Sequence, residues 1–126
     1  MSKNPDYRFT RASRLTAAAE YREVFRKNRR SADRYWTILY RNNNNEVARM
    51  GLAVSKKCAK RAIDRNRLKR LARETFRHHK QSLAGFDIVL MARHPGVSAS
   101  NAELRKSLNR HWSQIAESEC NMSPQT

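Results

Sequence analysis

The stretch "RNRLKRLARETFR", residues 65–77, has the spacing of a helix with two distinct sides. On a helical wheel that advances about 100° per residue, its apolar side falls within an arc of roughly 140°. The residues of this apolar arc are Leu68, Leu71, Ala72, Thr75 and Phe76. An adjoining arc of similar width holds Arg65, Asn66, Lys69, Arg70, Arg73 and Arg77. The pattern predicts a helix that packs on a core through one side and presents a cationic row on the other.

The cationic row carries a cost in the free protein. Like charges four residues apart on a helix repel each other by roughly 0.2–0.5 kcal/mol per pair, and Glu74 is the only acid in the stretch. An ordinary solvated face, which stays open as an alternative, usually mixes both signs. We interpret the row as a surface for phosphates, because the planar arginine fork binds phosphate oxygens in pairs. Asn66 is then a polar contact to nucleic acid or, alternatively, an ordinary surface residue.

The composition of the whole chain agrees with a polyanionic partner. The 126 residues include 27 Lys and Arg against 11 Asp and Glu, which gives a formal net charge of +16. Such an excess repels itself in a compact protein, so we expect RNA, DNA or an anionic membrane surface to balance it, and counterion release favours a nucleic acid. No apolar stretch approaches the roughly 20 residues of a membrane span, and no apolar run follows the basic N-terminus as in a signal peptide.

The two cysteines, Cys58 and Cys120, do not have the spacing of zinc ligands. They are typical of free thiols in a reducing compartment. We therefore expect a cytoplasmic protein that has no membrane partner.

The predicted elements follow the order helix, strand, strand, helix, strand, helix. They are a helix over 16–27, strands over 34–41 and 47–57, a helix over 61–79, a strand over 86–93, and a last helix that begins at a capping box of Ser100 and Glu103. The strands on either side of the four-Asn turn, 42–45, are predicted to pair as an antiparallel hairpin. The segment "RRSAD", 29–33, stays open as a further edge strand.

These elements predict an α+β fold, a small mixed sheet of three to four strands packed with three helices. We expect a basic flexible arm over residues 1–14, a single α/β sandwich domain over 15–117 and a disordered tail over 118–126. Alternation along the first strand places Trp36, Ile38 and Tyr40 on one face. Each aromatic residue alone is typical of a core. Together with aromatic residues of the first helix they could line a groove in which single-stranded nucleic acid stacks.

The acids and histidines do not suggest catalysis by the protein alone. A nuclease that acts without RNA needs carboxylates for metal ions or a general base. Asp64 and Glu74 are ten residues apart, and the adjacent His78 and His79 point apart on a helix. We therefore expect no catalytic residue and no metal ligand in this chain.

The longer stretch "SKKCAKRAIDRNRLKRLARETFR", residues 55–77, resembles the signature of the bacterial ribonuclease P protein component. The hallmark is the run of Arg65, Asn66 and Arg67 followed by Lys69 and Arg70, after a Ser-Lys-Lys at the end of a strand. The upstream "RLTAAAEYREVF", residues 14–25, is similar to the first helix of the family, and the resemblance extends over roughly residues 14–116.

The resemblance implies a subunit of a ribonucleoprotein endonuclease that removes the 5′ leader from precursor tRNA. The catalytic RNA would carry the active site and the Mg²⁺ ions, so the protein itself would bind no cofactor. The domain would be an RNA-binding one, with a left-handed βαβ crossover as in ribosomal protein S5 domain 2-like folds. A structural RNA-binding protein of the ribosomal type remains the alternative. A DNA-binding regulator is disfavoured because the spacing of a helix-turn-helix is missing.

The resemblance also assigns residues by position. The RNA-binding residues of the helix would be Arg65, Asn66, Arg67, Lys69, Arg70 and Arg73, with Lys69 and Arg73 reaching toward the leader. Those of the strand end and the following loop would be Lys56, Lys57, Lys60 and Arg61. A cleft between the sheet and the first helix would hold the leader against Tyr21, Phe25 and Tyr40, with Trp36 beside them.

Overall fold

One mixed sheet forms the middle layer of the protein. The computed structural model describes residues 22, 24–26, 28–43 and 47–122, with side chains up to residue 118. Its strands are β1 (Arg29–Ala32), β2 (Trp36–Asn42), β3 (Arg49–Ala53) and β4 (Phe86–Ala92), in the spatial order β1-β2-β4-β3. The strand β2 is antiparallel to both β1 and β4, whereas β3 is parallel to β4. The mixed α+β fold is thereby confirmed.

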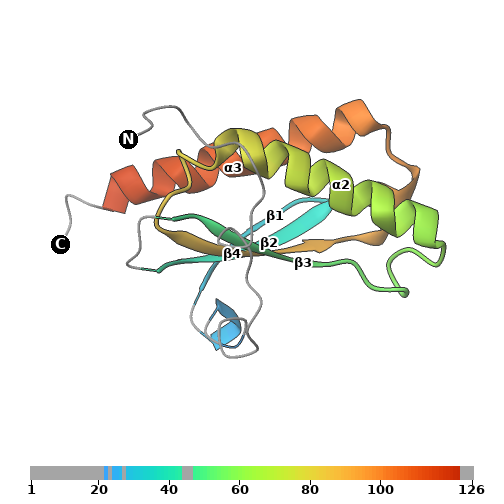
Figure 1. Ribbon diagram of the computed structural model, residues 1–126, viewed down its shortest axis with the longest axis horizontal. Helices are drawn as coiled ribbons and strands as arrows, with labels where there is room; N and C mark the ends of the chain where they lie inside the picture. The colour runs from blue at the N-terminus through green and yellow to red at the C-terminus, as the bar shows by residue number, and fades with distance from the viewer. Residues whose placement is uncertain (1–21, 23, 27, 44–46, 123–126) are drawn as a thin grey trace, which may run out of the picture.

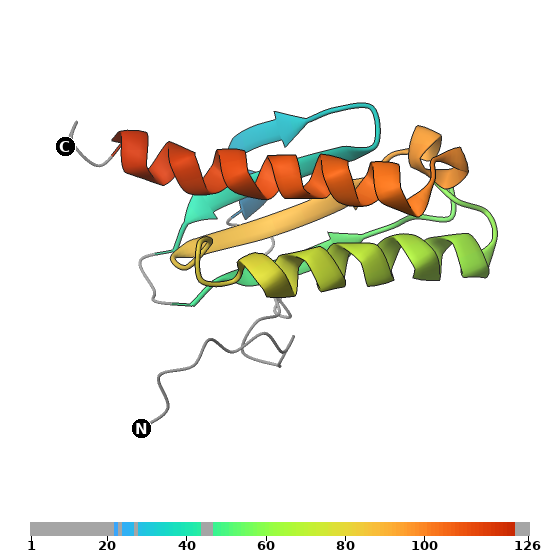
Figure 2. The same cartoon turned by 90° about the horizontal axis from the view of Figure 1, so that it is seen from above.

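Two long helices cover one face of this sheet. They are α2 (Ala62–His79) and α3 (Asn101–Met122), and both lie on the same side in Figures 1 and 2. The helical residues 22 and 24–26 lie on the opposite side (Figure 1). Parallel neighbours need a crossover connection, and α2 supplies it between β3 and β4. The βαβ unit is therefore present, and its left hand stays a prediction.

The hairpin predicted for the strands on either side of the four-Asn turn, which are β2 and β3 in the structure, is wrong. The strand β4 lies between β2 and β3, so these two strands do not pair. The turn after β2 is fixed to the start of β4 instead, because Asn43 N–H donates to Gly85 O at 2.7 Å. The central position gives β4, whose apolar side chains are buried on both faces of the sheet, a hydrogen-bonded partner on each edge.

Most predicted boundaries are confirmed within a few residues. The open segment "RRSAD" forms the edge strand β1, and α2 begins one residue after the expected position without a side-chain cap at Arg61. The capping box is present, since Glu103 N–H donates to Ser100 Oγ and Ser100 N–H donates to Glu103 Oε1, both at 3.1 Å. The helix α3 extends past the predicted start of the tail at 118, to Met122. The predicted arm, 1–14, lies outside the described residues.

The main core lies between the sheet and the two long helices. From the sheet it takes Trp36, Ile38, Tyr40, Met50, Ile88 and Leu90, and from the helices Leu68, Leu71, Ala72, Phe76, Leu104, Leu108, Trp112 and Ile115. Phe76 and Trp112 meet edge to face with ring centroids 5.8 Å apart. Trp112 Nε1–H donates to Thr75 Oγ1 at 3.0 Å, which satisfies both buried groups. A second, smaller cluster of Val24 and Val89, with Leu39 and Met91 beside it, lies on the other face.

Candidate nucleic-acid interface

The helix α2 has the two sides that its sequence predicts. Its apolar residues Leu68, Leu71, Ala72, Thr75 and Phe76 are all buried. Asn66, Arg70 and Arg73 are exposed, and Lys69 and Arg77 are half-buried on the same side. Because the apolar side is held by the core, the helix cannot turn its cations inward. The outward cationic row is therefore fixed in place by packing.

The loop between β3 and α2 adds four exposed cations to this row. They are Lys56, Lys57, Lys60 and Arg61. Ser55 shapes the loop, since its Oγ accepts from Cys58 N–H at 3.1 Å and its carbonyl accepts from Ala59 N–H at 3.0 Å. Cys58 and Ala59 point into the core, and burial raises the pKa of the Cys58 thiol. The buried pair anchors the loop, so its cations stay outside.

His94 contacts this loop, although the sequence did not indicate it as a site residue. It begins the short 3-10 helix η2 (His94–Ser98) that follows β4, and its Nδ1 lies 2.8 Å from Cys58 O. The carboxyl ends of the parallel strands β3 and β4 meet at one edge of the sheet, which brings His94 beside the lysine loop. The "HPG" that ends β4 could have indicated the residue, but only if β3 and β4 had been recognised as parallel neighbours.

The two arginines of the Arg-Asn-Arg run differ from the exposed residues of the row. Arg65 Nη1 donates to the carbonyls of Ala59 at 2.9 Å and Lys60 at 2.8 Å. Arg67 turns toward α3 and η2, where its terminal nitrogens donate to four acceptors. Both guanidinium groups are therefore bonded to the protein itself, and Asn66 between them is the exposed member of the run.

The acids near the row leave its positive charge largely unbalanced. Glu74 Oε1 accepts from Arg105 Nε of α3 at 2.8 Å. This bond, with the charges of Arg77 and His78, holds the pKa of Glu74 below its ordinary value. Asp64 lies 3.7 Å from Arg61 at the start of α2, a distance at which an exposed pair contributes little. Within the described residues, no group of three or more His, Cys, Asp or Glu side chains could hold a metal ion.

The predicted aromatic cleft is wrong for two of its four residues. Trp36 is fully buried and Tyr40 is 8% exposed, and both belong to the core under α2 and α3. A cleft between the sheet and the first helix would lie on the other face, where Val24 packs on Val89. Phe25 is 50% exposed next to Val24, in agreement with a position at such a cleft. Tyr21 lies outside the described residues.

A partly buried ion pair braces the face of the sheet opposite α2 and α3, near one end of β3 and β4. Arg49 binds Asp87 with two hydrogen bonds, Nε to Oδ1 at 2.8 Å and Nη2 to Oδ2 at 2.7 Å. Asn43 Nδ2 adds a third bond to Asp87 Oδ1 at 2.8 Å. Asp87 is the one acid in an apolar strand, and its carboxylate is satisfied by these donors. This cluster fixes the register of β3 against β4.

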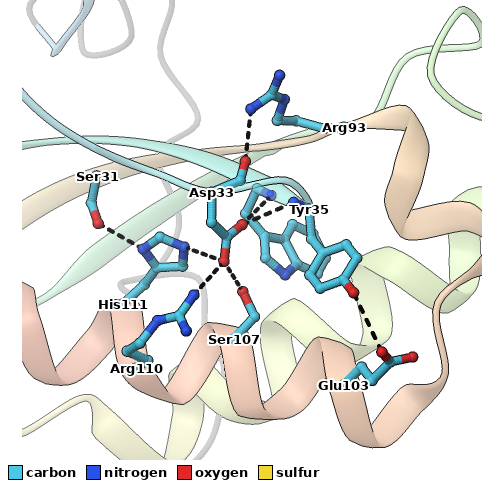
Figure 3. A network of polar contacts seen from close by, with 9 residues as sticks. Ser31, Asp33, Tyr35, Arg93, Glu103, Ser107, Arg110 and His111 are labelled. Carbon is cyan, nitrogen blue, oxygen red and sulfur yellow. Dashed lines mark hydrogen bonds and ion pairs between the residues drawn. The ribbon is translucent and has the colours of Figure 1, made fainter.

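A second polar cluster fastens the turn between β1 and β2 to α3 (Figure 3). Asp33 Oδ1 accepts from the backbone N–H of Tyr35 at 2.9 Å and of Trp36 at 3.0 Å. Its Oδ2 accepts from Ser107 and, at 2.8 Å, from Arg110 Nη2. Burial raises the pKa of Asp33, but the hydrogen bonds from Ser107, Tyr35 and Trp36 outweigh it and hold the pKa below its ordinary value. The carboxylate is therefore charged in the folded protein at neutral pH.

His111 lies beside this carboxylate and is only 2% exposed. Its Nε2 is 3.1 Å from Asp33 Oδ2, and its Nδ1 is 2.6 Å from Ser31 Oγ. Burial lowers the pKa of His111, and the attraction of Asp33 only partly opposes this. Figure 3 shows that the cluster draws on β1, the turn and α3. We interpret it as structural.

Fold and site together define a small, single-sheet basic protein whose cationic helix is presented for a polyanion. None of its described helices has the length and apolar character needed to cross a bilayer. The family model described as "Ribonuclease P" matches residues 9–116. The chain therefore belongs to the ribonuclease P protein family, as a protein component of that ribonucleoprotein enzyme.

Individual relatives agree with this assignment. The chain is 48% identical over 111 residues to the ribonuclease P protein component of Thioalkalivibrio sulfidiphilus, covering 88% of this chain and 92% of that one. The Methylococcus capsulatus protein of the same name is 44% identical over 106 residues, covering 84% and 83%.

Solved structures give the same answer for the fold. The RNase P protein of Staphylococcus aureus superposes with a TM-score of 0.75 at 32% identity, covering 84% of this chain and 96% of that one. The Thermotoga maritima RNase P protein gives a TM-score of 0.72 at 29% identity, covering 81% and 96%.

Proposed function

We propose that the protein binds the catalytic RNA subunit of ribonuclease P through the exposed side of α2 and the loop that precedes it. The observation that carries the proposal is the cationic row, held outward because the other side of the same helix is locked into the core. Arg70 and Arg73 meet phosphates there, Lys69 supports them, and Asn66 supplies a neutral donor and acceptor. Lys56, Lys57, Lys60 and Arg61 extend the contact.

The bound protein then helps the RNA to cut the 5′ leader from precursor tRNA. The reacting groups and the Mg²⁺ ions belong to the RNA, and the protein contributes binding and charge. The single-stranded leader runs over the sheet face opposite α2 and α3, where Phe25 offers an exposed ring for stacking. The buried free thiol of Cys58 suits the reducing cytoplasm, where we place the protein.

A reconstitution experiment tests this division of labour. Precursor tRNA is incubated at low Mg²⁺ with the protein alone, with the catalytic RNA alone, and with both. We expect leader removal by the RNA to become faster when the protein is added, and no cleavage by the protein alone. Cleavage without the RNA would refute the placement of the chemistry. No acceleration, together with ribosomal RNA as the species that co-purifies with the protein, would favour a structural ribosomal role instead.

A further inference from the structure

Arg67, in the middle of the basic helix, uses its terminal nitrogens within the protein. Its Nη1 donates to Asn101 Oδ1 at 2.7 Å and to Ala99 O at 3.3 Å. Its Nη2 donates to Val97 O at 2.8 Å and to Gly96 O at 3.4 Å. Each terminal nitrogen of a guanidinium carries two hydrogens, so all four are engaged. No free pair of terminal N–H groups remains to grip a phosphate.

The acceptors of Arg67 belong to one connection, the segment that links β4 to α3. Three are carbonyls in or just after η2, and the fourth is the side chain of the first residue of α3. The segment packs closely, since a Cβ added at the buried Gly96 would lie 3.5 Å from Leu104 Cδ2 and 3.8 Å from Leu68 Cδ2. Arg67 therefore ties α2 to this connection by binding carbonyls at the end of a short helix.

The same connection reaches the lysine loop. His94 begins η2, and its Nδ1 lies 2.8 Å from Cys58 O. A carbonyl can only accept, so Nδ1 carries the hydrogen of this bond. Cys58 lies in the loop that carries Lys56, Lys57 and Lys60. A continuous path of bonds thus runs from Arg67 through η2 and His94 to the exposed lysines.

We infer that Arg67 is a positioning residue, which holds η2 and the lysine loop in the arrangement that binds RNA and makes no phosphate contact itself. The inference rests on the proposed function of the cationic row. Arg70, three residues further along the same helix, is exposed and provides the matched control. The two arginines share charge and side-chain length, and they differ in what their guanidinium groups touch.

The test compares Arg67→Ala, Arg67→Lys, Arg70→Ala and Arg70→Lys. Affinity for the catalytic RNA is measured over a range of salt concentrations, at a temperature where circular dichroism shows every variant folded. Both Arg67 variants should bind roughly two- to thirtyfold more weakly, because neither alanine nor lysine can reproduce the fork of hydrogen bonds. Their salt slope should be unchanged, because Arg67 meets no phosphate. Arg70→Ala should reduce the slope by about 0.7–0.9, and Arg70→Lys should restore it.

A milder change removes an acceptor of Arg67 instead of the arginine itself. Asn101→Ala removes one acceptor of Arg67 and leaves every charge in place, so it serves even if Arg67→Ala does not fold. It should weaken RNA binding in the same direction, and its effect should not add to that of Arg67→Lys, because both break the same bond.

Each remaining outcome counts against one claim. A smaller salt slope in Arg67→Ala that Arg67→Lys restores would mean that Arg67 meets phosphate, which overturns the inference. Arg67 variants that melt earlier but bind RNA like the wild type would make the residue purely structural, which also overturns it. Wild-type protein that does not bind the catalytic RNA would refute the proposed function itself.

Discussion

Asp33 gathers more side-chain hydrogen bonds than its sequence context suggests. The sequence shows an acid ahead of an apolar strand. A turn can be predicted there, because an Asp side chain accepts hydrogen bonds from the backbone that follows it. The donors Ser107 and Arg110 come from α3, more than 70 residues later, at separations of 74 and 77. Local patterns hold no information about such partners. The same is true of Asp87, whose partner Arg49 is 38 residues away.

Replacement of Asp33 should be among the most damaging single changes outside the apolar core. We expect Asp33→Ala to lower the free energy of unfolding by about 3 kcal/mol, because hydrogen bonds to a charged group contribute about 1.5–3 kcal/mol each and the turn loses its anchor on α3. Urea denaturation measures the change. Asp64→Ala is the control and should cost less than about 1 kcal/mol, since the 3.7 Å pair with Arg61 is weak. Equal losses in the two variants would contradict the role given to Asp33.

His111 should make the stability of the protein depend on pH. Because its pKa is lowered in the folded state, the unfolded chain takes up a proton first as the pH falls below the ordinary histidine value of about 6.5. Stability is then complete above that value and decreases as the pH falls toward the lowered pKa. We expect His111→Gln to flatten the decrease between about pH 7.5 and 5.5. Chemical denaturation at several pH values checks this, and an identical decrease in the variant would assign it to other groups.

At the scale of elements, α2 could be predicted almost completely. Its apolar and cationic arcs follow from the helical period alone, and its observed bounds differ from the expected ones by one residue. The exposure of single side chains could not be predicted to the same extent. In the sequence Arg65 and Arg67 are members of a charge run, but in the structure they donate to carbonyls of other segments. A wheel gives the direction of a side chain but not what lies in that direction.

The sequence predicted which segments form strands, but it predicted the wrong pairing for β2 and β3. The turn of four asparagines between two apolar segments favours a hairpin, because consecutive strands usually pair. The competing arrangement inserts β4 between them, so that the most apolar strand takes the centre of the sheet. Its run "FDIVLMA" does indicate burial on both faces. What the sequence could not reveal is which two strands would lie on its edges.

The pairing of β3 with β4 depends on the Arg49–Asp87 pair. We expect Arg49→Ala to destabilise the protein by about 3–5 kcal/mol, because it leaves the carboxylate of Asp87 buried beside an apolar sheet without its main partner. Thermal and urea unfolding would measure the loss. Lys106→Ala, an exposed lysine on α3, should be close to neutral. A loss below about 1 kcal/mol for Arg49→Ala would mean that the register of β3 is fixed by apolar contacts alone.

On the scale of the whole molecule, the two faces of the sheet have different tasks. One face carries the core under α2 and α3, and Trp36 and Tyr40 are part of that core. The other face carries the small cluster around Val24 and Val89. Alternation along β2 correctly grouped Trp36 with Tyr40, but it cannot say which face two long helices will cover. That choice depends on the complete fold, and it decides which aromatic residues are open to a ligand.

The same packing holds the cationic row of α2 and the cations of the preceding loop outward. Core contacts hold α2 in a single rotation, and buried Cys58 and Ala59 hold the loop before it. The repulsion within the row is therefore a property of the free protein, and a polyanion relieves it on binding. Removal of these charges should weaken RNA binding without weakening the fold.

The most direct test of this central claim is the salt dependence of binding to the catalytic RNA. If the wild-type protein neutralises four to six phosphates, the log–log slope should be about −3 to −5. The triple variant Lys69→Ala, Arg70→Ala and Arg73→Ala should flatten it by about two to three units, with a free energy of unfolding equal to or above that of the wild type. An unchanged slope in a folded triple variant would mean that RNA does not touch this side of α2.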